Sequence, residues 1–418
     1  MSVFKIIPTT QQYDWGKVGS KSVVAQLAAS SQVNTEFTLD ESKPYAELWM
    51  GTHPTSPSHI PSPSKPTLSS HLKSHPLLIG NAVASKFPGA REGNLPFLFK
   101  VLSIETALSV QTHPDKKTAE ALHAQLPHIY KDDNHKPELA LALTPFRALC
   151  GFQPLSKIAK FLFTTPELSA LIPKTIVDNF LSISSGSNST SPEAKTALKD
   201  LFTALMTADE GLIKGQADAL VHRYQSSMPE DGSIEELVLR LNDQFPGDVG
   251  VFCAFILNYI TLSPGEAIFL GAGEPHAYVS GDIIECMANS DNVIRAGLTP
   301  KLRDVPNLVA GLTYVSAEGS RHRVLPSPYP SSTSTGSKLY DPPIPEFSVI
   351  QVRVQTAETH PPVVGPSLTV VAEGKGVISW GKGQELQIEK GDVFFIGADT
   401  SVQMEGDGMT LYRAFVEA

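Results

Sequence analysis

Three polar side chains that could bind a metal or carry a proton alternate along one short segment. They are Ser109, Gln111 and His113, and Val110 and Thr112 lie between them. Because successive side chains of a β-strand point to opposite faces, a strand here would place the three polar groups together. The sequence therefore predicts a strand with one chemical face and one packing face.

Two further segments carry side chains of the same kind. Lys136 and Glu138 flank Pro137 and share a face of an extended segment, and strands tolerate proline only at an edge or a bulge. Far downstream, His276 and Tyr278 again share a face. Two His, one Glu and one Gln could bind a divalent metal such as zinc, with a water or substrate oxygen completing the site.

The alternative is that these residues are structural. A single histidine in a strand is usually a hydrogen-bonded structural residue, and glutamine is an uncommon metal ligand. Against this, a buried Gln, Glu or Lys without a partner costs kilocalories, so several of them on apolar strands indicate a shared site.

Composition restricts the class of protein. The chain has 418 residues, so two or three domains are expected, and its net charge of -10 argues against nucleic-acid or acidic-membrane partners. Three widely spaced cysteines suggest neither a disulfide framework nor a cysteine-based zinc finger, and favour a reducing compartment. The first residues lack a basic segment leading into an apolar one, and no apolar run reaches bilayer length. We expect a soluble cytoplasmic protein, and a monomer.

Changes in residue pattern indicate the domain boundaries. Helical patterns dominate one long segment, with Ser191 before Pro192 and the capping box that starts at Ser233 as helix-start signals. Strand patterns dominate before and after it, and a Pro/Ser/Thr-rich stretch follows. The predicted division is residues 1–151 and 261–325 as the two parts of a catalytic domain, 152–260 as a helical insert, 326–343 as a linker and 344–418 as a C-terminal domain.

An internal repeat supports two related β-domains. The turn, strand and turn at residues 265–272 resemble those at 391–398, which predicts two barrels of the double-sheet jelly-roll type. At the same offset, Val402 stands opposite His276. The C-terminal copy is therefore predicted to lack the metal site.

Two local predictions concern the first part of the chain. The Ser-, Pro- and His-rich residues from Pro54 to about Ser74 predict an exposed loop with little capacity to bury surface. The apolar run from Leu95 to Leu102 predicts a buried strand, in which Lys100 must reach solvent or meet an anion.

Several long motifs, taken together, resemble the eukaryotic type I mannose-6-phosphate isomerases. The resemblance extends in the same order from Tyr13 to about Tyr314 and is weaker in the C-terminal domain. The motifs are Gln111-Thr112-His113-Pro114, Asn134-His135-Lys136-Pro137-Glu138, Pro44-Tyr45-Ala46-Glu47-Leu48-Trp49-Met50-Gly51, Glu274-Pro275-His276-Ala277-Tyr278 and Asp291-Asn292-Val293-Ile294-Arg295-Ala296-Gly297-Leu298-Thr299-Pro300-Lys301.

The resemblance implies a mainly β, cupin-type enzyme with two jelly rolls, an all-α inserted domain and one Zn²⁺ per chain. It implies zinc ligands that coincide with the four residues reached above: Gln111, His113, Glu138 and His276. The implied remainder of the active-site pocket comprises Trp15, Glu47, Ser109, Lys136, Tyr278, Glu285, Asp291, Arg295 and Lys301.

The reaction of that family interconverts mannose 6-phosphate and fructose 6-phosphate and links glycolysis to GDP-mannose and glycosylation. It requires proton transfer between C2 and C1 through a cis-enediol, so an acid-base group and a stabiliser of negative charge are needed. We expect Arg295 to be essential as the charge stabiliser, because arginine rarely deprotonates. Lys136, Glu285 and His276 remain alternatives for the base.

The phosphate and the sugar ring need further partners. No Gly-rich phosphate loop occurs in the chain, so Ser109, Lys100 and Lys301 are the candidates for the phosphate. Trp15 and Tyr278 could form walls of the pocket.

Two other functional classes compete with the isomerase. Two histidines and a carboxylate also bind iron in cupin-fold oxygenases, although Gln111 as a further ligand disfavours chemistry that needs open coordination positions. A non-catalytic sugar-phosphate-binding protein is the other class, and the retention of Lys136, Glu285 and Arg295 argues against it.

Overall fold

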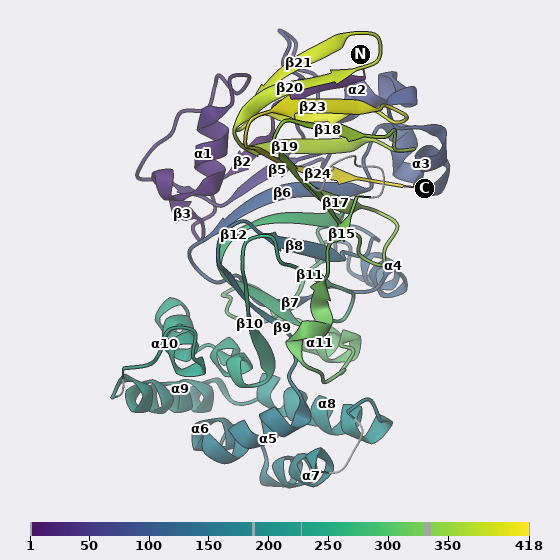
Figure 1. Cartoon of the computed structure of the whole chain (residues 1–418). Coiled ribbons are helices and arrows are strands. Elements are labelled where there is room, and N and C mark those ends of the chain that lie inside the picture. Colours follow the sequence, from purple (N-terminus) through teal and green to yellow (C-terminus); the bar gives the residue numbers. More distant parts are fainter. Residues whose placement is uncertain (1, 186–188, 227, 330–335, 418) are drawn as a thin grey trace.

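The computed structural model describes residues 2–185, 189–226, 228–329 and 336–417. Three layers follow one another along the molecule in Figure 1: a C-terminal pair of β-sheets, a central β-region and a group of helices at the opposite end. No helix in the described ranges is long and apolar enough to cross a bilayer.

The central region is an eleven-stranded set of sheets organised around one long strand, β12 (His276–Ala288). Gly281, with φ of 117°, lies where β12 passes from one group of partners to the other; a Cβ there would lie 2.6 Å from the carbonyl oxygen of Pro145. One group follows the order β14 (Arg323–Val324), β11 (Ala267–Leu270), β8 (Glu138–Ala142), β12, β6 (Phe97–Ile104), β5 (Glu47–Met50) and β2 (Thr9–Gln11). The other contains β7 (Val110–Thr112), β9 (Phe146–Phe152), β10 (Leu257–Leu262) and β13 (Ile294–Gly297).

The predicted alternation of a chemical and a packing face is present in β7 and its neighbours. Val110, Ala277 and Ile294 are buried in the core that also contains the inserted helices. Gln111, His276 and Arg295 occupy the adjacent positions on the same three strands. The helical insert thus covers the back of the strands that carry the polar residues.

Short helices and a two-stranded sheet occur in the N-terminal part of the chain. They are α1 (Val23–Ser30), α2 (Leu68–Ser74), α3 (Asn81–Lys86), α4 (Lys116–Gln125), the 3₁₀ turns η1 (Gly19–Lys21), η2 (Pro76–Leu78) and η3 (Pro88–Glu92), and the antiparallel pair of β3 (Lys17–Val18) and β4 (Pro44–Tyr45).

The prediction of an exposed loop up to Ser74 was wrong for its last part. The Thr67 side chain accepts a hydrogen bond from the Ser70 amide and caps α2, and Leu68 and Leu72, one helical turn apart, are fully buried. The Ser- and His-rich composition concealed this short amphipathic pattern.

The insert is helical, and two of its described helices begin where the capping signals predict. The side chains of Ser191 and Ser233 accept hydrogen bonds from the amides three residues later. The helices are α5 (Leu155–Thr164), α6 (Pro166–Ser169), α7 (Lys174–Ser184), α8 (Pro192–Met206), α9 (Glu210–Gln225) and α10 (Ile234–Gln244), followed by η4 (Val249–Phe255). After β13 the chain forms α11 (Val305–Gly311) and η5 (Gly319–His322).

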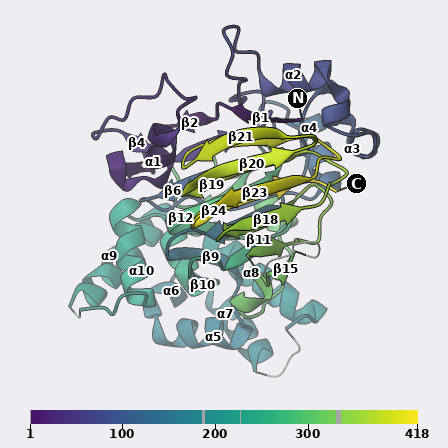
Figure 2. The same cartoon turned by 45° about the horizontal axis from the view of Figure 1, so that its top comes forward.

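The C-terminal region contains two stacked sheets with a separate apolar core between them. Figure 2 shows the four-stranded sheet in front of the larger one. The larger has the order β1 (Val3–Ile6), β22 (Val393–Ile396), β19 (Ser367–Glu373), β24 (Met409–Phe415), β17 (Ser348–Val354), β16 (Ser337–Tyr340) and β15 (Ser327–Pro328). The smaller has the order β18 (Ala357–His360), β23 (Val402–Gly406), β20 (Lys375–Trp380) and β21 (Gln384–Glu389).

The internal repeat corresponds to equivalent strands in the two β-regions. β22 begins and ends 126 residues after β11, and β23 begins 126 residues after β12, so Val402 opens β23 as His276 opens β12. Val402 is packed in the apolar core of its own sheets.

Two segments belong to the C-terminal sheet although the predicted domain division places one in the catalytic domain and the other in the linker. β1, at the start of the chain, pairs with β22 in the C-terminal sheet. β15 and β16, within the predicted linker, are also strands of that sheet, and residues 330–335 of the linker lie outside the described residues. One hydrophobic core joins residues of the two β-regions, including Val101 and Ile284 on one side and Val370 and Tyr412 on the other.

Candidate metal centre and active site

His113, Glu138 and His276 come together from three different strand segments and are all buried. His113 Nε2 lies 3.3 Å from Glu138 Oε1, and His276 Nε2 lies 3.3 Å from Glu138 Oε2. No other cluster of three or more His, Cys, Asp or Glu side chains in the described part of the chain has potential ligand atoms so close together.

Both imidazole rings are oriented by hydrogen bonds from the other nitrogen. His113 Nδ1 donates to the backbone oxygen of Asn292 at 2.7 Å, and His276 Nδ1 donates to that of Glu274 at 3.0 Å. Both Nε2 atoms are buried and have no hydrogen-bond partner. Burial lowers the pKa of His113 to about 4, against the attraction of Glu138, so its ring is neutral at pH 7. Two imidazoles whose Nε2 atoms have no hydrogen-bond partner, on either side of a buried carboxylate, fit a zinc ion.

Gln111 lies next to this cluster in the β-ladder. Its Cα is the cross-strand partner of both His276 and Arg295. The Gln111 Oε1 atom accepts a hydrogen bond of 3.3 Å from the Ser109 hydroxyl. The strand therefore brings the two predicted residues together beside the histidines.

Lys136 and Tyr278 contact the carboxylate of the cluster. Lys136 Nζ lies 3.3 Å from Glu138 Oε1, and the Tyr278 hydroxyl donates to Glu138 Oε2 at 3.4 Å. Burial, followed by the charges of Glu138 and Glu285, raises the pKa of Tyr278 well above its usual value, so the hydroxyl stays protonated.

A second charged group, which the sequence did not reveal as a unit, surrounds Lys100. Its Nζ lies 3.2 Å from Glu285 Oε2 and 3.4 Å from Glu47 Oε2, and it lies over the ring of Trp49 at 4.8 Å. Trp49 in turn donates its indole N–H to Glu47. Lys100 and Glu285 are directly paired across β6 and β12, so the strand register places them together.

Opposing effects act on the protonation of this group. Burial lowers the pKa of Lys100, but the carboxylates of Glu47, Glu285 and Glu138 outweigh it, and the pKa is raised. The pKa of Glu285 is raised by burial, against the attraction of Lys100. Lys100 is therefore a permanent cation, and Glu285 holds a proton at higher pH than an ordinary carboxyl does.

Arg295 is a half-buried arginine with no hydrogen-bond or ion-pair partner in the described parts of the chain. It lies in β13, directly opposite Gln111 in β7. Burial lowers its pKa, but an arginine remains charged at neutral pH. An uncompensated guanidinium on a strand next to the predicted metal ligand Gln111 is suited to an anionic group.

Three predicted residues form no hydrogen bond or ion pair with His113, Glu138 or His276 in the described chain. Trp15 packs beside the core that contains Tyr278, and its ring stacks on Tyr13 at 6.0 Å. Asp291 is partly exposed, with Oδ1 3.4 Å from His53 Nε2. Lys301 is exposed and lines a hollow of about 620 Å³ between the insert and the loop after β13; none of the four predicted metal ligands lines that hollow.

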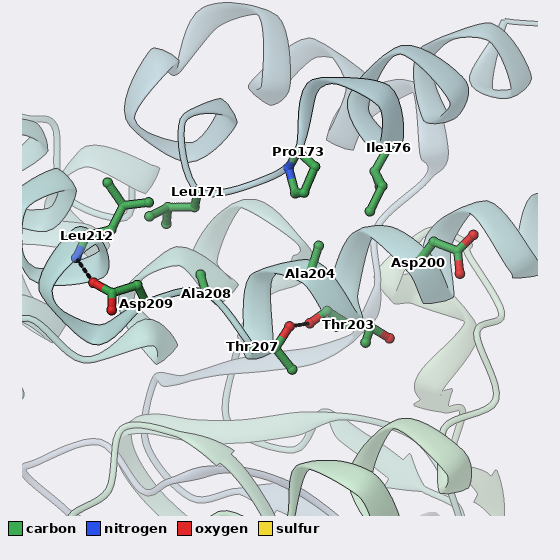
Figure 3. Close-up of a pocket in the computed structure, with 10 residues that line it drawn as sticks. All are labelled: Leu171, Pro173, Ile176, Asp200, Thr203, Ala204, Thr207, Ala208, Asp209 and Leu212. Atoms are coloured by element: carbon green, nitrogen blue, oxygen red, sulfur yellow. Dashed lines mark hydrogen bonds between the residues drawn. The ribbon is translucent and has the colours of Figure 1, made fainter.

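A different hollow, in the helical insert, lacks catalytic side chains. The hollow has a volume of about 440 Å³. Figure 3 shows Leu171, Ile176 and Ala204 among the residues that line it. Of its two lining carboxylates, Asp200 and Asp209, Asp209 accepts a hydrogen bond from the Leu212 amide as the cap of α9. None of the predicted site residues lines it.

Sequence reasoning missed Asn292 and Glu274 as residues that orient the two histidines. Both contribute backbone oxygens, which no side-chain pattern reveals. It also missed Trp49 and His53, whose contacts depend on strand pairing and loop position.

The fold therefore combines two β-regions, a helical insert and one buried His/Glu cluster that could hold a metal ion. Comparison with known proteins identifies the family that has this combination. Residues 3–155, 171–257 and 337–382 match the families described as phosphomannose isomerase type I catalytic domain, helical insertion domain and C-terminal region.

The sequence is also similar to those of curated relatives over nearly the full length of both chains. The chain is 50% identical to the mannose-6-phosphate isomerase of Cryptococcus neoformans var. neoformans, covering 100% of this chain and 99% of the relative. It is 46% identical to that of Saccharomyces cerevisiae, covering 99% of each.

Solved structures show the same architecture. A zinc-bound mannose 6-phosphate isomerase superposes with a TM-score of 0.83 at 31% identity, and the match covers 100% of both chains. A point mutant of phosphomannose isomerase from Salmonella typhimurium gives the same values. The chain belongs to the type I phosphomannose isomerases, and its enzymatic class is mannose-6-phosphate isomerase.

Proposed function

We propose that the chain binds one Zn²⁺ through Gln111, His113, Glu138 and His276. The observation that carries this proposal is the pair of buried, unpartnered Nε2 atoms on either side of Glu138. Two buried imidazole nitrogens without a hydrogen-bond partner, beside a buried carboxylate, raise the free energy of the folded state unless a cation binds between them. A structural relative, the zinc-bound mannose 6-phosphate isomerase, supports the choice of metal.

We further propose that the isomerisation proceeds through a cis-enediol. A zinc ion in this site supplies Lewis-acid stabilisation of negative charge on oxygen. One chain residue must then remove a proton from C2 and return it to C1, or the reverse. Lys136 is next to the metal ligand Glu138, whereas Glu285 is held by Lys100, so both remain candidates and the position of Lys136 is the more direct.

Arg295 provides the second positive group of the mechanism. Its guanidinium has no hydrogen-bond or ion-pair partner in the described chain, and the Arg295 backbone pairs with Gln111 across β13 and β7. It would neutralise charge that develops on the enediolate oxygens, a contribution that is strongest when the group is positioned beforehand.

The remaining predicted residues would hold the substrate. Ser109, Lys100 and Lys301 are proposed for the phosphate, and Glu47 and Asp291 for sugar hydroxyls. Trp15 and Tyr278 would form the walls. Lys100 suits an anionic or hydroxyl group because it stays protonated.

The wider assignments are also proposals. The two β-regions are cupin-like jelly rolls, and the domain division is the predicted one except that β1, β15 and β16 belong to the C-terminal sheet. The chain is a cytoplasmic monomer that supplies mannose for GDP-mannose and glycosylation. The net charge of -10 supports the absence of nucleic-acid and membrane partners.

The test is isomerase activity with mannose 6-phosphate before and after removal of zinc by a chelator. We expect activity to be lost and then restored by one equivalent of zinc per chain. Iron-dependent oxygen consumption, or sugar-phosphate binding without turnover in zinc-loaded protein, would contradict the proposal.

A further inference from the structure

The orientation of His276 depends on the backbone just before it. Its Nδ1 donates to the carbonyl oxygen of Glu274 at 3.0 Å, and its Nε2 faces Glu138 at 3.3 Å. A shift of the Glu274 carbonyl would therefore rotate the ring away from the metal position. Such partners of metal-binding histidines control ligand orientation and metal affinity.

The loop that carries Glu274, between β11 and β12, is tied to the other histidine. The Gly273 amide donates to the carbonyl oxygen of His113 at 2.9 Å, and the Thr313 amide donates to that of Gly273 at 3.1 Å. Gly273 has a φ of 72°, and a Cβ there would lie 2.6 Å from the carbonyl oxygen of Gly311. The loop thus touches the backbone of one predicted ligand and orients the ring of another.

The Glu274 side chain anchors this loop to the segment after α11. It is 5% exposed, and its Oε1 accepts hydrogen bonds from Thr313 Oγ1 at 3.0 Å and Arg321 Nη2 at 2.9 Å. Arg321 Nη1 also donates to the carbonyl oxygen of Val315 at 3.4 Å. A charge-assisted bond on the buried side of a carboxylate holds position more firmly than a neutral one.

Arg321 is the essential counter-charge of this carboxylate. The other basic group nearby is His322, whose Nε2 lies 3.8 Å from Glu274 Oε2. Burial, followed by the charge of Arg321, lowers the pKa of His322 to about 4, so this ring is neutral at pH 7. In the described chain, Arg321 is the only permanently charged group within 4.0 Å of Glu274.

A hollow beside Glu274 leaves space for its side chain to change conformation if Arg321 is replaced. Glu274, Arg321 and His322 line a hollow of about 530 Å³. A buried carboxylate without its counter-ion is strongly disfavoured and would turn towards water in this hollow. The Glu274 carbonyl, and with it the His276 ring, would follow.

We propose that the ion pair of Glu274 and Arg321, together with Thr313, positions His276 for metal binding. Arg321 holds the Glu274 side chain, and the Glu274 carbonyl oxygen in turn orients the His276 ring. Arg321 is then a positioning residue of the metal centre. The inference rests on the proposed zinc site, and it concerns the strength with which that site holds the metal.

The test is zinc affinity, measured by competition with a chromophoric chelator, in Arg321→Met and in a matched control, Arg323→Met. Arg323 forms an ion pair with Glu266 and has a nearly equal side-chain exposure, 34% against 33% for Arg321. It borders the same hollow, but in the described chain its guanidinium donates to Glu266 and to the carbonyl oxygen of Thr261 and not to Glu274. We expect Arg321→Met to lower zinc affinity about 10-fold to 100-fold. The control should remain within about 2-fold of the parent, and Arg321→Lys, which keeps the charge, should recover part of the loss.

The thermal unfolding midpoint of each metal-free protein separates positioning from general destabilisation. Equal zinc affinity in Arg321→Met and the parent overturns the inference, and so does an equal loss in both arginine variants. If Arg321→Met does not fold, Thr313→Val and Glu274→Gln replace it, and unchanged affinity in both overturns the inference. A parent protein that binds no zinc refutes the proposed metal centre instead.

Discussion

Replacing Lys100 by Met removes the cation that separates two buried carboxylates. Glu47 and Glu285 are 7% and 3% exposed, and each lies within 3.4 Å of Lys100 Nζ. Removing one partner of a buried ion pair typically costs about 3 to 5 kcal/mol, because a charge remains without compensation. The lost contact with the Trp49 ring adds about 0.5 to 2 kcal/mol, which does not depend on pH.

The electrostatic part of this loss depends on pH with a definite sign. Burial already raises the pKa of Glu285 against the pull of Lys100, so the variant raises it further. In the unfolded chain Glu285 releases its proton above about pH 4.3, whereas in the folded variant it keeps that proton up to its raised pKa. The free energy of unfolding of the variant therefore falls as pH rises between these two pKa values. The free energy of unfolding changes by about 1.36 kcal/mol for each pH unit above about pH 4.3. The electrostatic loss is therefore limited to about 1 kcal/mol at pH 5, and it reaches its full value of about 3 to 5 kcal/mol near pH 8.

Urea unfolding of the metal-free proteins at pH 5 and pH 8, followed by circular dichroism, measures both values. Lys157→Met is the control, since Lys157 and Glu318 form an exposed pair expected to contribute about 0 to 1 kcal/mol. The double variant Lys100→Met with Glu285→Gln should recover most of the loss at pH 8. A deficit of equal size at both pH values, or no recovery in the double variant, would refute the electrostatic reasoning.

Three further predictions concern activity and packing. Arg295→Ala should abolish isomerisation while zinc stays bound, as measured by turnover and metal analysis; near-normal turnover would remove Arg295 from the mechanism. Lys301→Ala should chiefly raise the Michaelis constant for mannose 6-phosphate, and an unchanged constant would exclude its phosphate role. Gly151→Ala should lower the free energy of unfolding by about 2 to 4 kcal/mol, since Gly151 has a φ of 66° and a Cβ would lie 2.3 Å from His322 Nε2; a loss below about 0.5 kcal/mol in urea unfolding would contradict it.

Local signals in the sequence were sufficient for many individual elements. The caps at Ser191 and Ser233 and the strand around Lys100 depend on neighbouring residues, and the structure confirms them. The same holds for the spacing of Gln111 and His113, since residues two apart in a strand share a face. Short-range hydrogen bonds and side-chain direction are properties of a few consecutive residues.

The predictions that were wrong concern elements that depend on contacts with residues distant in the sequence. Nothing near Val3 indicates that β1 will pair with β22 almost 400 residues later, because strand partners are selected by the core they bury together. The helix starting at Leu68 was missed because two buried leucines outweigh an otherwise polar composition once tertiary packing is available.

For the site, the sequence by itself determined which residue types could bind a metal and, through the family resemblance, which reaction they would serve. Only the tertiary structure decided how these residues are oriented and charged. The pairing of Lys100 with Glu285 comes from the register of β6 and β12, and the orientation of the His113 ring comes from the backbone oxygen of Asn292, which is 179 residues away in the sequence. Protonation and ligand direction depend on burial and on neighbours distant in sequence, and both exist only after the chain has folded.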